Sequence, residues 1–189
     1  MANEHRFLAV DFGAESGRGI IVTLADGRVD MEEIHRFPNR RVELAGVVYW
    51  DFPFLYAEML EAMRICAARG VALDGISVDT WGVDFGLLDK RGELLGLPVS
   101  YRDGRTEGIH EYSGKVMSKD EIFQATASET WAISSLFQLL AMQRDKSPLL
   151  EAADTFLNIP NLFLYLLTGK KVNERSIVSS AALMGTDGQ

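Results

Sequence analysis

Cysteine is almost absent from this chain of 189 residues, in which Cys66 is the one thiol. A single cysteine cannot close an intramolecular disulfide or build a thiolate metal cluster. Long hydrophobic runs are absent as well, because none approaches the roughly 20 apolar residues that a membrane helix needs. The composition therefore predicts a protein of a reducing, cytoplasmic environment that has no membrane partner.

Positive charge is also scarce, with 19 Lys and Arg residues against 27 Asp and Glu residues and a net charge of -8. Nucleic-acid affinity depends largely on Lys and Arg that neutralise backbone phosphates, so the composition predicts no nucleic-acid partner. If the protein handles a phosphate, it must do so with a few local groups and a metal ion. The hydrophobic content of 47% and the charged content of 24% are typical of a globular chain that can bury a core.

The first part of the chain contains three β-rich runs, at residues 7–10, 19–24 and 29–37. The segments "GAESGR" and "ADG" separate them, and Gly27 in the second segment is a hairpin signal because glycine accepts positive φ at low cost. The pattern predicts three successive antiparallel strands.

A helix of about five turns is predicted next. Asp51 is a plausible N-cap, Pro53 suits the first turn, and Gly70 suits the C-terminal stop. Apolar residues recur at helical spacing along this segment, at Phe52, Leu55, Met59, Met63 and Cys66.

Strands and helices alternate in the rest of the chain. We expect a strand at 75–79, a tight turn through Trp81 and Gly82, and another strand at 83–88. Helices are expected at 109–117, from about 119, at 135–144 and at 161–167. This order predicts an α/β fold with a mixed five-stranded sheet and helices on its faces, the ribonuclease H-like domain of actin- and hexokinase-type ATPases.

The segment "DFGAESGR" combines an acid, a glycine turn and an arginine between two predicted strands. Gly13 and Gly17 allow a sharp turn whose exposed amides can bind an anion, and the hydroxyl of Ser16 adds a donor. Arg18 can hold a phosphate through two parallel hydrogen bonds, and Asp11 is placed to hold Mg²⁺. The segment lacks the GK[ST] ending of a P-loop and opens a strand, which excludes the Walker and Rossmann motifs. A plain glycine hairpin with a solvated arginine is the alternative.

The segment "ISVDTWGVDFGLLD" carries two acids, Asp79 and Asp84, on either side of a Trp-Gly turn at a strand end. Ligands usually bind at such strand ends in α/β sheets. Trp81 offers an apolar face to the carbons of a sugar ring, and the carboxylates can accept hydrogen bonds from hydroxyl groups. Alternatively, Trp81 fills core space and both acids cap turns.

A third polar cluster follows in "VSYRDGRTEG", with Tyr101, Arg102, Asp103 and Arg105 in one turn. Tyr101 could stack on a polyol to which Arg105 donates hydrogen bonds. The alternative is a surface group of ion pairs, which contributes little energy.

Taken together, "AVDFGAESGRG", "DTWGVDFGLLD" and "PVSYRDGRT" resemble, in order and spacing, the amino-terminal domain of FGGY-family carbohydrate kinases. The segment "LYLLTGK" resembles a further stretch of that domain. Within the family, the resemblance is strongest to the rhamnulokinases, which use ATP to phosphorylate L-rhamnulose. Two places depart from their pattern: Ile133, Ser134 and Ser135 replace a Phe-Asn-Thr run, and Asn161 replaces an Asp. Xylulose, fuculose and glycerol therefore stay open as substrates.

The resemblance implies ATP and Mg²⁺ as cofactors and a small sugar as the partner molecule. It assigns the ATP phosphates to Ala14, Glu15, Ser16, Gly17 and Arg18. Asp11 would be the acid on the metal side. Together with the residues singled out above, the sugar candidates are Trp81, Gly82, Asp84, Tyr101 and Arg105.

The family's catalytic base is an Asp in a His-Asp-Thr run, and no His-Asp pair occurs in this sequence. No catalytic residue is therefore assigned within the chain, and the base is expected to lie beyond Gln189. Family members are also far longer and carry a second domain. We expect residues 1–189 to be an incomplete amino-terminal kinase domain, nearly inactive alone, from an enzyme that makes a ketose 1-phosphate.

The alternative is a non-catalytic module that binds sugar or assembles with other copies. A face left exposed by the missing second domain would favour self-association.

Overall fold

The computed structural model describes residues 4–188, in two compact units. Unit 1 contains the chain up to Arg41 together with Asp51–Trp81. Unit 2 contains Val42–Trp50 and the chain from Gly82 onward. Each unit is described by itself below.

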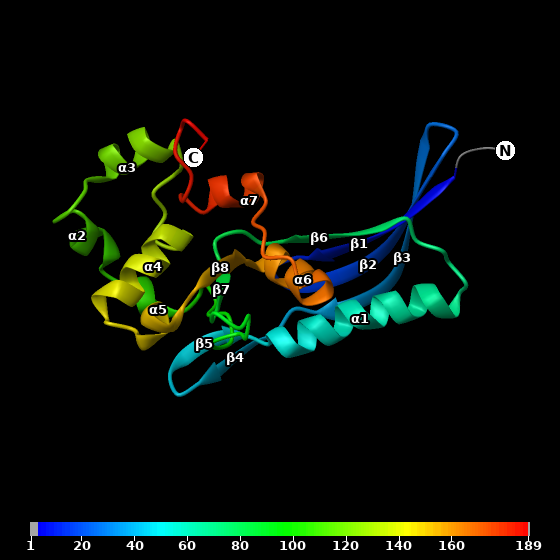
Figure 1. The fold of residues 1–189 in the computed structure, drawn as a ribbon, viewed down its shortest axis with the longest axis horizontal. Helices are drawn as coiled ribbons and strands as arrows, with labels where there is room; N and C mark the ends of the chain where they lie inside the picture. Colours follow the sequence, from blue (N-terminus) through cyan, green and yellow to red (C-terminus); the bar gives the residue numbers. More distant parts are fainter. Residues whose placement is uncertain (1–3, 189) are drawn as a thin grey trace. The chain divides into compact units, whose positions relative to one another are not determined.

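Unit 1 is built on a mixed sheet (Figure 1). In the described part of the chain this sheet has four strands in the order β3-β2-β1-β6, which are Arg28–Pro38, Ser16–Ala25, His5–Phe12 and Gly75–Thr80. The pairs β1–β2 and β2–β3 are antiparallel, and β1–β6 is parallel. The three predicted antiparallel strands are confirmed. The register places Asp11 of β1 opposite Arg18 of β2 and opposite Asp79 of β6.

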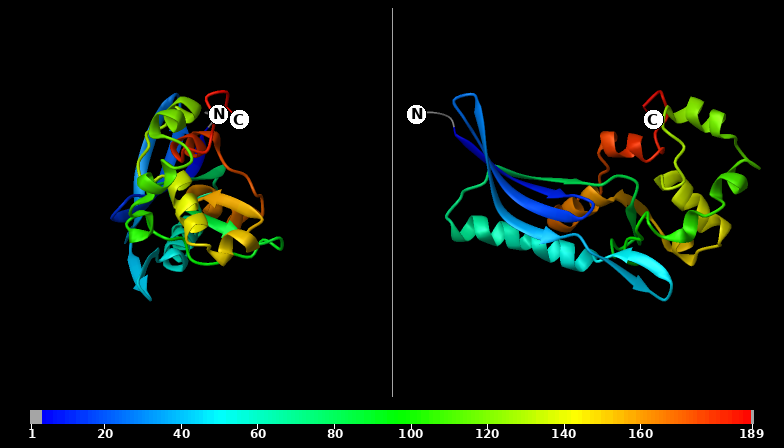
Figure 2. Two further views of the ribbon diagram at one scale, coloured as in Figure 1. Left: turned by 90° about the vertical axis from the view of Figure 1, so that its left-hand side faces the viewer. Right: turned by 180° about the vertical axis from the view of Figure 1, so that it is seen from behind.

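Helix α1, Phe52–Ala68, runs along one face of this sheet (Figures 1 and 2). The carboxylate of Asp51 accepts a hydrogen bond from the Phe54 amide, and Gly70 follows the helix with φ of 68°, as the sequence predicts. A Cβ atom on Gly19 would lie 2.7 Å from the Cβ of Ala62, so the missing side chain lets α1 approach the sheet closely. The helix buries Phe52, Leu55, Met59, Ala62 and Cys66.

The prediction of a fifth strand in this sheet is wrong. The segment predicted at 83–88 forms β7, Phe85–Leu88, which pairs antiparallel with β8, Thr155–Asn158, instead of joining the four strands. The physical reason is that β8 supplies the backbone hydrogen-bond partners of β7, whose four residues are all buried. Strand β8 has no alternation that signals it in the sequence. Helix α6, Ile159–Thr168, packs against both strands and ends at Gly169, close to the expected helix at 161–167.

The rest of unit 2 is mainly helical, and its elements surround a small apolar core. Ile109 of α2 (Ile109–Ser113), Ile122 of α3 (Lys119–Thr126), and Phe137 and Ala141 of α4 (Ser135–Arg144) form a buried cluster. The helix expected at 109–117 ends at Ser113, because Gly114 caps it. The remaining elements are β4 Arg41–Leu44, β5 Val47–Trp50, a 3₁₀ turn Gly104–Thr106, α2 Ile109–Ser113, α3 Lys119–Thr126, α4 Ser135–Arg144, α5 Pro148–Ala152 and α7 Arg175–Ser180. No helix formed by residues 4–188 is both long and apolar enough to cross a lipid bilayer.

Candidate functional site

The first candidate is the turn between β1 and β2, residues 13–15, which we call the first turn. The amide of Gly13 donates to the carbonyl oxygen of Ser16 over 3.0 Å and closes the turn. Ala14 and Glu15 are exposed, and their amides have no main-chain acceptor among the described residues. Successive exposed amides of this kind suit an anionic ligand, so the turn fits the predicted contact with phosphates.

Asn39, which the sequence analysis did not single out, holds the first turn from the end of β3. Its amide donates to the carbonyl of Glu15 over 2.9 Å, and its Nδ2 donates to the carbonyl of Gly13 over 2.6 Å. The signal in the sequence is weak, a short amide side chain directly after Pro38 at the end of a strand. The contact joins residues 26 positions apart, which a local pattern cannot show.

Asp11 and Arg18 face each other across the hairpin, and the guanidinium Nη2 donates to the Asp11 carboxylate. Their side chains are 31% and 42% exposed. This contact engages one of the five N–H donors of the guanidinium, which can donate to an anion through its other N–H groups. Asp11 and Asp79 are register partners on adjacent strands, which places two carboxylates side by side near the carboxyl ends of β1 and β6.

A magnesium ion beside Asp11 would need further oxygen ligands that the described part of the chain does not supply. Among residues 4–188 there is no group of three His, Cys, Asp or Glu side chains placed to hold a metal ion. Mg²⁺ is commonly held by one or two carboxylates together with substrate phosphates, and Asp11 fits that kind of site.

Positions 13 and 17 require glycine for a different reason from the one that the sequence predicts. Neither Gly13 nor Gly17 adopts a left-handed φ, so the turn does not depend on the backbone freedom of glycine. A Cβ atom on Gly17 would lie 2.2 Å from the ring of Phe37, and one on Gly13 would lie 2.9 Å from the carbonyl oxygen of Ser16. Both positions require glycine because neighbouring atoms occupy the space of a side chain.

The second candidate is the turn at residues 82–84 in unit 2, which we call the second turn. Val83 is left-handed at φ 72°, a rare conformation for a β-branched residue. Asp84 is only 1% exposed. Its carboxylate accepts hydrogen bonds from Trp50 Nε1 over 2.6 Å, from the Tyr101 amide over 3.1 Å and from Gln138 Nε2 over 2.9 Å. The protein itself therefore provides donors for both oxygens of this predicted sugar contact.

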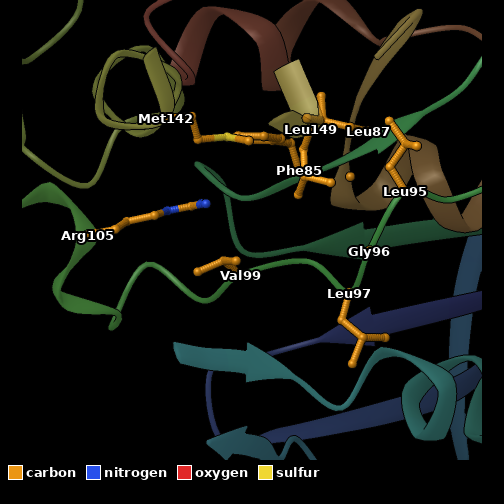
Figure 3. Close-up of a pocket in the computed structure, with 10 residues that line it drawn as sticks. Phe85, Leu87, Leu95, Gly96, Leu97, Val99, Arg105, Met142 and Leu149 are labelled. Atoms are coloured by element: carbon orange, nitrogen blue, oxygen red, sulfur yellow. The ribbon is translucent and has the colours of Figure 1, made fainter. Parts of the chain in front are cut away.

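Arg105 belongs to the same network, because its Nη2 donates to Oε1 of Gln138. Its guanidinium carbon lies 5.6 Å from the centroid of the Phe85 ring. Figure 3 shows the side chain extending into an apolar pocket lined by Phe85 and Val99, among others. Burial lowers the pKa of Arg105, and the nearby charges of Asp84 and Asp103 oppose that shift.

The structure therefore brings together Gly82, Asp84, Tyr101 and Arg105, the predicted sugar residues of unit 2. Trp81 belongs to unit 1 and is half-buried. The roles of these residues in binding stay predictions.

Two further members of the network, Trp50 and Gln138, were missed. Trp50 is fully buried and lies beside the Tyr101 ring, with 6.1 Å between the ring centroids. The available signals were Trp50 directly before a helix cap and Gln138 as a polar residue inside the apolar run "SLFQLLAM".

The catalytic base is the one site group that the sequence analysis expects outside this chain, beyond Gln189. Gln189 itself lies outside the described residues, which end at Gly188. The position of the base therefore stays a prediction, and the site described above consists of binding residues.

Comparison with known proteins places this geometry in a family. Residues 6–187 match the amino-terminal domain of the FGGY family of carbohydrate kinases. The chain belongs to this family, as the sequence analysis inferred.

Curated relatives agree with that assignment. A rhamnulokinase from Bacteroides thetaiotaomicron is 41% identical over 186 residues, which is 98% of this chain and 38% of the relative. One from Oceanobacillus iheyensis is 38% identical over 177 residues, which is 94% of this chain and 38% of the relative. The chain thus spans about 38% of the length of these relatives.

Among solved structures, a xylulose kinase from Lactobacillus acidophilus has a TM-score of 0.81 at 15% identity, covering 96% of this chain and 37% of that one. Plasmodium falciparum glycerol kinase with ADP has a TM-score of 0.76 at 16% identity, covering 98% and 39%. At these identities the likeness concerns the fold. The predicted fold class, an α/β domain of the actin and hexokinase type, is confirmed.

Proposed function

We propose that the whole protein is an ATP-dependent sugar kinase, of which this chain is the amino-terminal part. It transfers the γ-phosphate of MgATP to a hydroxyl of a ketose, most favourably L-rhamnulose, and forms the sugar 1-phosphate. Family membership and the rhamnulokinase relatives support this proposal. The observation that carries it is the first turn, where exposed amides, Arg18 and Asp11 lie in one hairpin.

The first turn would hold the nucleotide. The amides of Ala14 and Glu15, the hydroxyl of Ser16 and the guanidinium of Arg18 would donate to the phosphate oxygens, while Gly17 leaves room for the ring of Phe37. Asp11 would bind Mg²⁺. When bound, MgATP supplies the phosphoryl group and the metal charge that stabilises its transfer.

The second turn would hold the sugar. Gly82 and the aromatic face of Tyr101 would contact the ketose, since aromatic rings pack on the apolar face of a sugar. Asp84 and Arg105 would support these contacts from within the buried network, because the Asp84 carboxylate accepts the Tyr101 amide.

Two measurements test the part of the proposal that concerns the nucleotide: the binding of MgADP and the release of ADP during turnover. Phosphoryl transfer needs a base or orienting group near the attacking hydroxyl, and we propose that this group lies beyond Gln189. The chain alone should bind MgADP and release almost no ADP from MgATP and L-rhamnulose in a coupled assay, whereas the full-length protein should turn over. Turnover by the chain alone at the rate of the full-length protein would contradict the proposal that it lacks the base.

A test of the sugar is calorimetry on the full-length protein. L-Rhamnulose should bind more tightly than xylulose, fuculose or glycerol. Tighter binding of one of those three would move the proposal to another member of the family. Binding of a sugar without any turnover would favour the non-catalytic module instead.

We also propose that the isolated chain self-associates and that the protein works in the cytoplasm, where a buried thiol such as Cys66 stays reduced. Self-association is supported by large apolar side chains exposed on unit 2, namely Val116, Met117, Phe123 and Trp131. Gel filtration across a range of concentrations should show a rising apparent mass. A monomer at every concentration would contradict this part of the proposal.

A further inference from the structure

Gln138 connects more parts of the second turn than any residue chosen from the sequence. It lies on α4 and is 1% exposed. Its Nε2 lies 3.0 Å from the Val83 carbonyl oxygen, 2.9 Å from Asp84 Oδ1 and 2.7 Å from the Ile133 carbonyl oxygen. Its Oε1 accepts from Arg105. One amide side chain therefore touches the backbone of the turn, the buried carboxylate and the guanidinium.

Val83 shows why the turn needs this support. Its left-handed φ of 72° is an outlier for a β-branched residue, and such strain persists only where the surroundings determine it. Two side chains of α4 donate to its carbonyl oxygen, Gln138 Nε2 and Ser135 Oγ, the latter over 2.6 Å. Both donors are buried, so water does not compete with them.

The chemistry of the site requires an amide at position 138. The side chain must donate to a carbonyl and a carboxylate and also accept from a guanidinium, and an uncharged amide does both. A methionine of similar size would leave the Asp84 carboxylate and the Arg105 guanidinium each short of one partner. A glutamate would bring a second carboxylate against Asp84.

We propose that Gln138 is a positioning residue for the sugar site. It is too deeply buried to reach a ligand, and it acts by keeping Val83 in the left-handed conformation that orients Gly82 and Asp84. This inference rests on the proposed function, because it takes the second turn to be the surface that binds the sugar.

The experiment compares Gln138→Met with Gln143→Met in the full-length protein. Gln143 lies on the same helix and is exposed, so the control repeats the chemical change away from the network. We expect Gln138→Met to weaken L-rhamnulose binding by about tenfold, roughly the effect of losing a buried hydrogen bond, while the MgADP affinity stays within about twofold. Amide hydrogen exchange at residues 82–84 should quicken in this variant and stay unchanged in the control.

Ser135→Ala is the second variant, and it carries the test if Gln138→Met does not fold. It removes one of the two side-chain donors to the Val83 carbonyl oxygen, so it should change the same two measurements in the same direction and by less. A purely structural role would lower the melting temperature and leave the sugar Kd and the exchange at 82–84 of the folded protein unchanged. That result would overturn the inference.

The outcomes also separate this inference from the proposed function. If the unmodified protein binds L-rhamnulose and Gln138→Met binds it equally well, the positioning role is wrong and the proposed function stands. If the unmodified protein binds no ketose in calorimetry, the proposed function fails and the positioning role fails with it.

Discussion

The backbone conformations of the first turn and the second turn are stabilised in different ways. The first turn and the start of β2 use ordinary φ values, and Gly13 and Gly17 stand where neighbouring atoms leave no room for a side chain. The second turn puts a β-branched residue, Val83, into a left-handed conformation and holds it with buried donors from α4. The first turn therefore depends on the absence of side chains, and the second depends on the presence of particular ones.

The two turns also differ in their exposure to solvent. Ala14 and Glu15 of the first turn are exposed, and the Asp11–Arg18 pair is partly solvated. Asp84 of the second turn is buried and accepts three hydrogen bonds. Substitutions in the Asp11–Arg18 pair should consequently cost little stability, whereas substitution of Asp84 should cost more, because exposed ion pairs contribute little stability while unpaired buried donors are costly.

The largest expected effect is on stability at the second turn. Asp84→Ala removes the carboxylate that accepts from Trp50 Nε1 and from the Tyr101 amide, and it takes away one of the three acceptors near Gln138 Nε2. We expect the free energy of unfolding to fall by about 3 kcal/mol, since each unsatisfied buried donor has its own desolvation cost. Urea denaturation measures this. Asp30→Ala, at an exposed position of β3, is the control, and an equal loss in both variants would refute the buried network.

The second largest expected effect tests whether position 17 requires glycine because a larger side chain would not fit there. Gly17→Ala would put a Cβ atom 2.2 Å from the Phe37 ring. We expect the free energy of unfolding to fall by about 2 kcal/mol because the ring must shift within a packed core. Gly96→Ala is the control in a thermal unfolding series, because the nearest atom to its new Cβ is 4.0 Å away. If the two variants unfold alike, the steric reason for Gly17 is wrong.

Ligand affinity should respond at the first turn with little change in stability. Arg18→Met should weaken MgADP binding by about tenfold through the loss of charge-assisted hydrogen bonds. The free energy of unfolding should change by less than about 1 kcal/mol, because the pair with Asp11 is partly exposed. Arg36→Met removes the same charge from the register partner on β3 and should leave MgADP binding unchanged in calorimetry. Equal effects of the two variants would indicate a general charge effect.

The smallest expected effect is a pH dependence of stability that arises from Asp74. This residue directly precedes β6, at the opposite end of that strand from Asp79. Asp74 accepts the Arg6 amide over 2.8 Å, and this hydrogen bond lowers the pKa of Asp74. A carboxylate with a lowered pKa stabilises the fold above the unfolded-state pKa of about 4, and this stabilisation disappears as the pH falls. Stability should decline from about pH 5 to pH 3, and less steeply in Asp74→Asn. Urea denaturation of both proteins at each pH measures this difference.

Much of unit 1 could be predicted from the sequence. The strands β1, β2 and β3, helix α1 with its Asp51 cap, and the position of the first turn all follow from patterns within a few residues. Asn39 was missed because its contact with Gly13 crosses 26 residues. In unit 2 the helices were largely found, but β8 was missed and β7 was assigned to the wrong sheet.

What the sequence determined by itself is the local alternation of elements and the family motifs, and it supplied the candidate residues for the predicted phosphate and sugar contacts. Only the tertiary structure decided that β7 pairs with β8, that Asp84 is buried, and that Trp50 and Gln138 donate to it. The reason is the sequence separation of these contacts, which is 34 residues for Trp50 and 54 for Gln138. Periodicity and turn propensity describe neighbours along the chain, whereas a buried carboxylate takes its partners from whatever the fold packs around it.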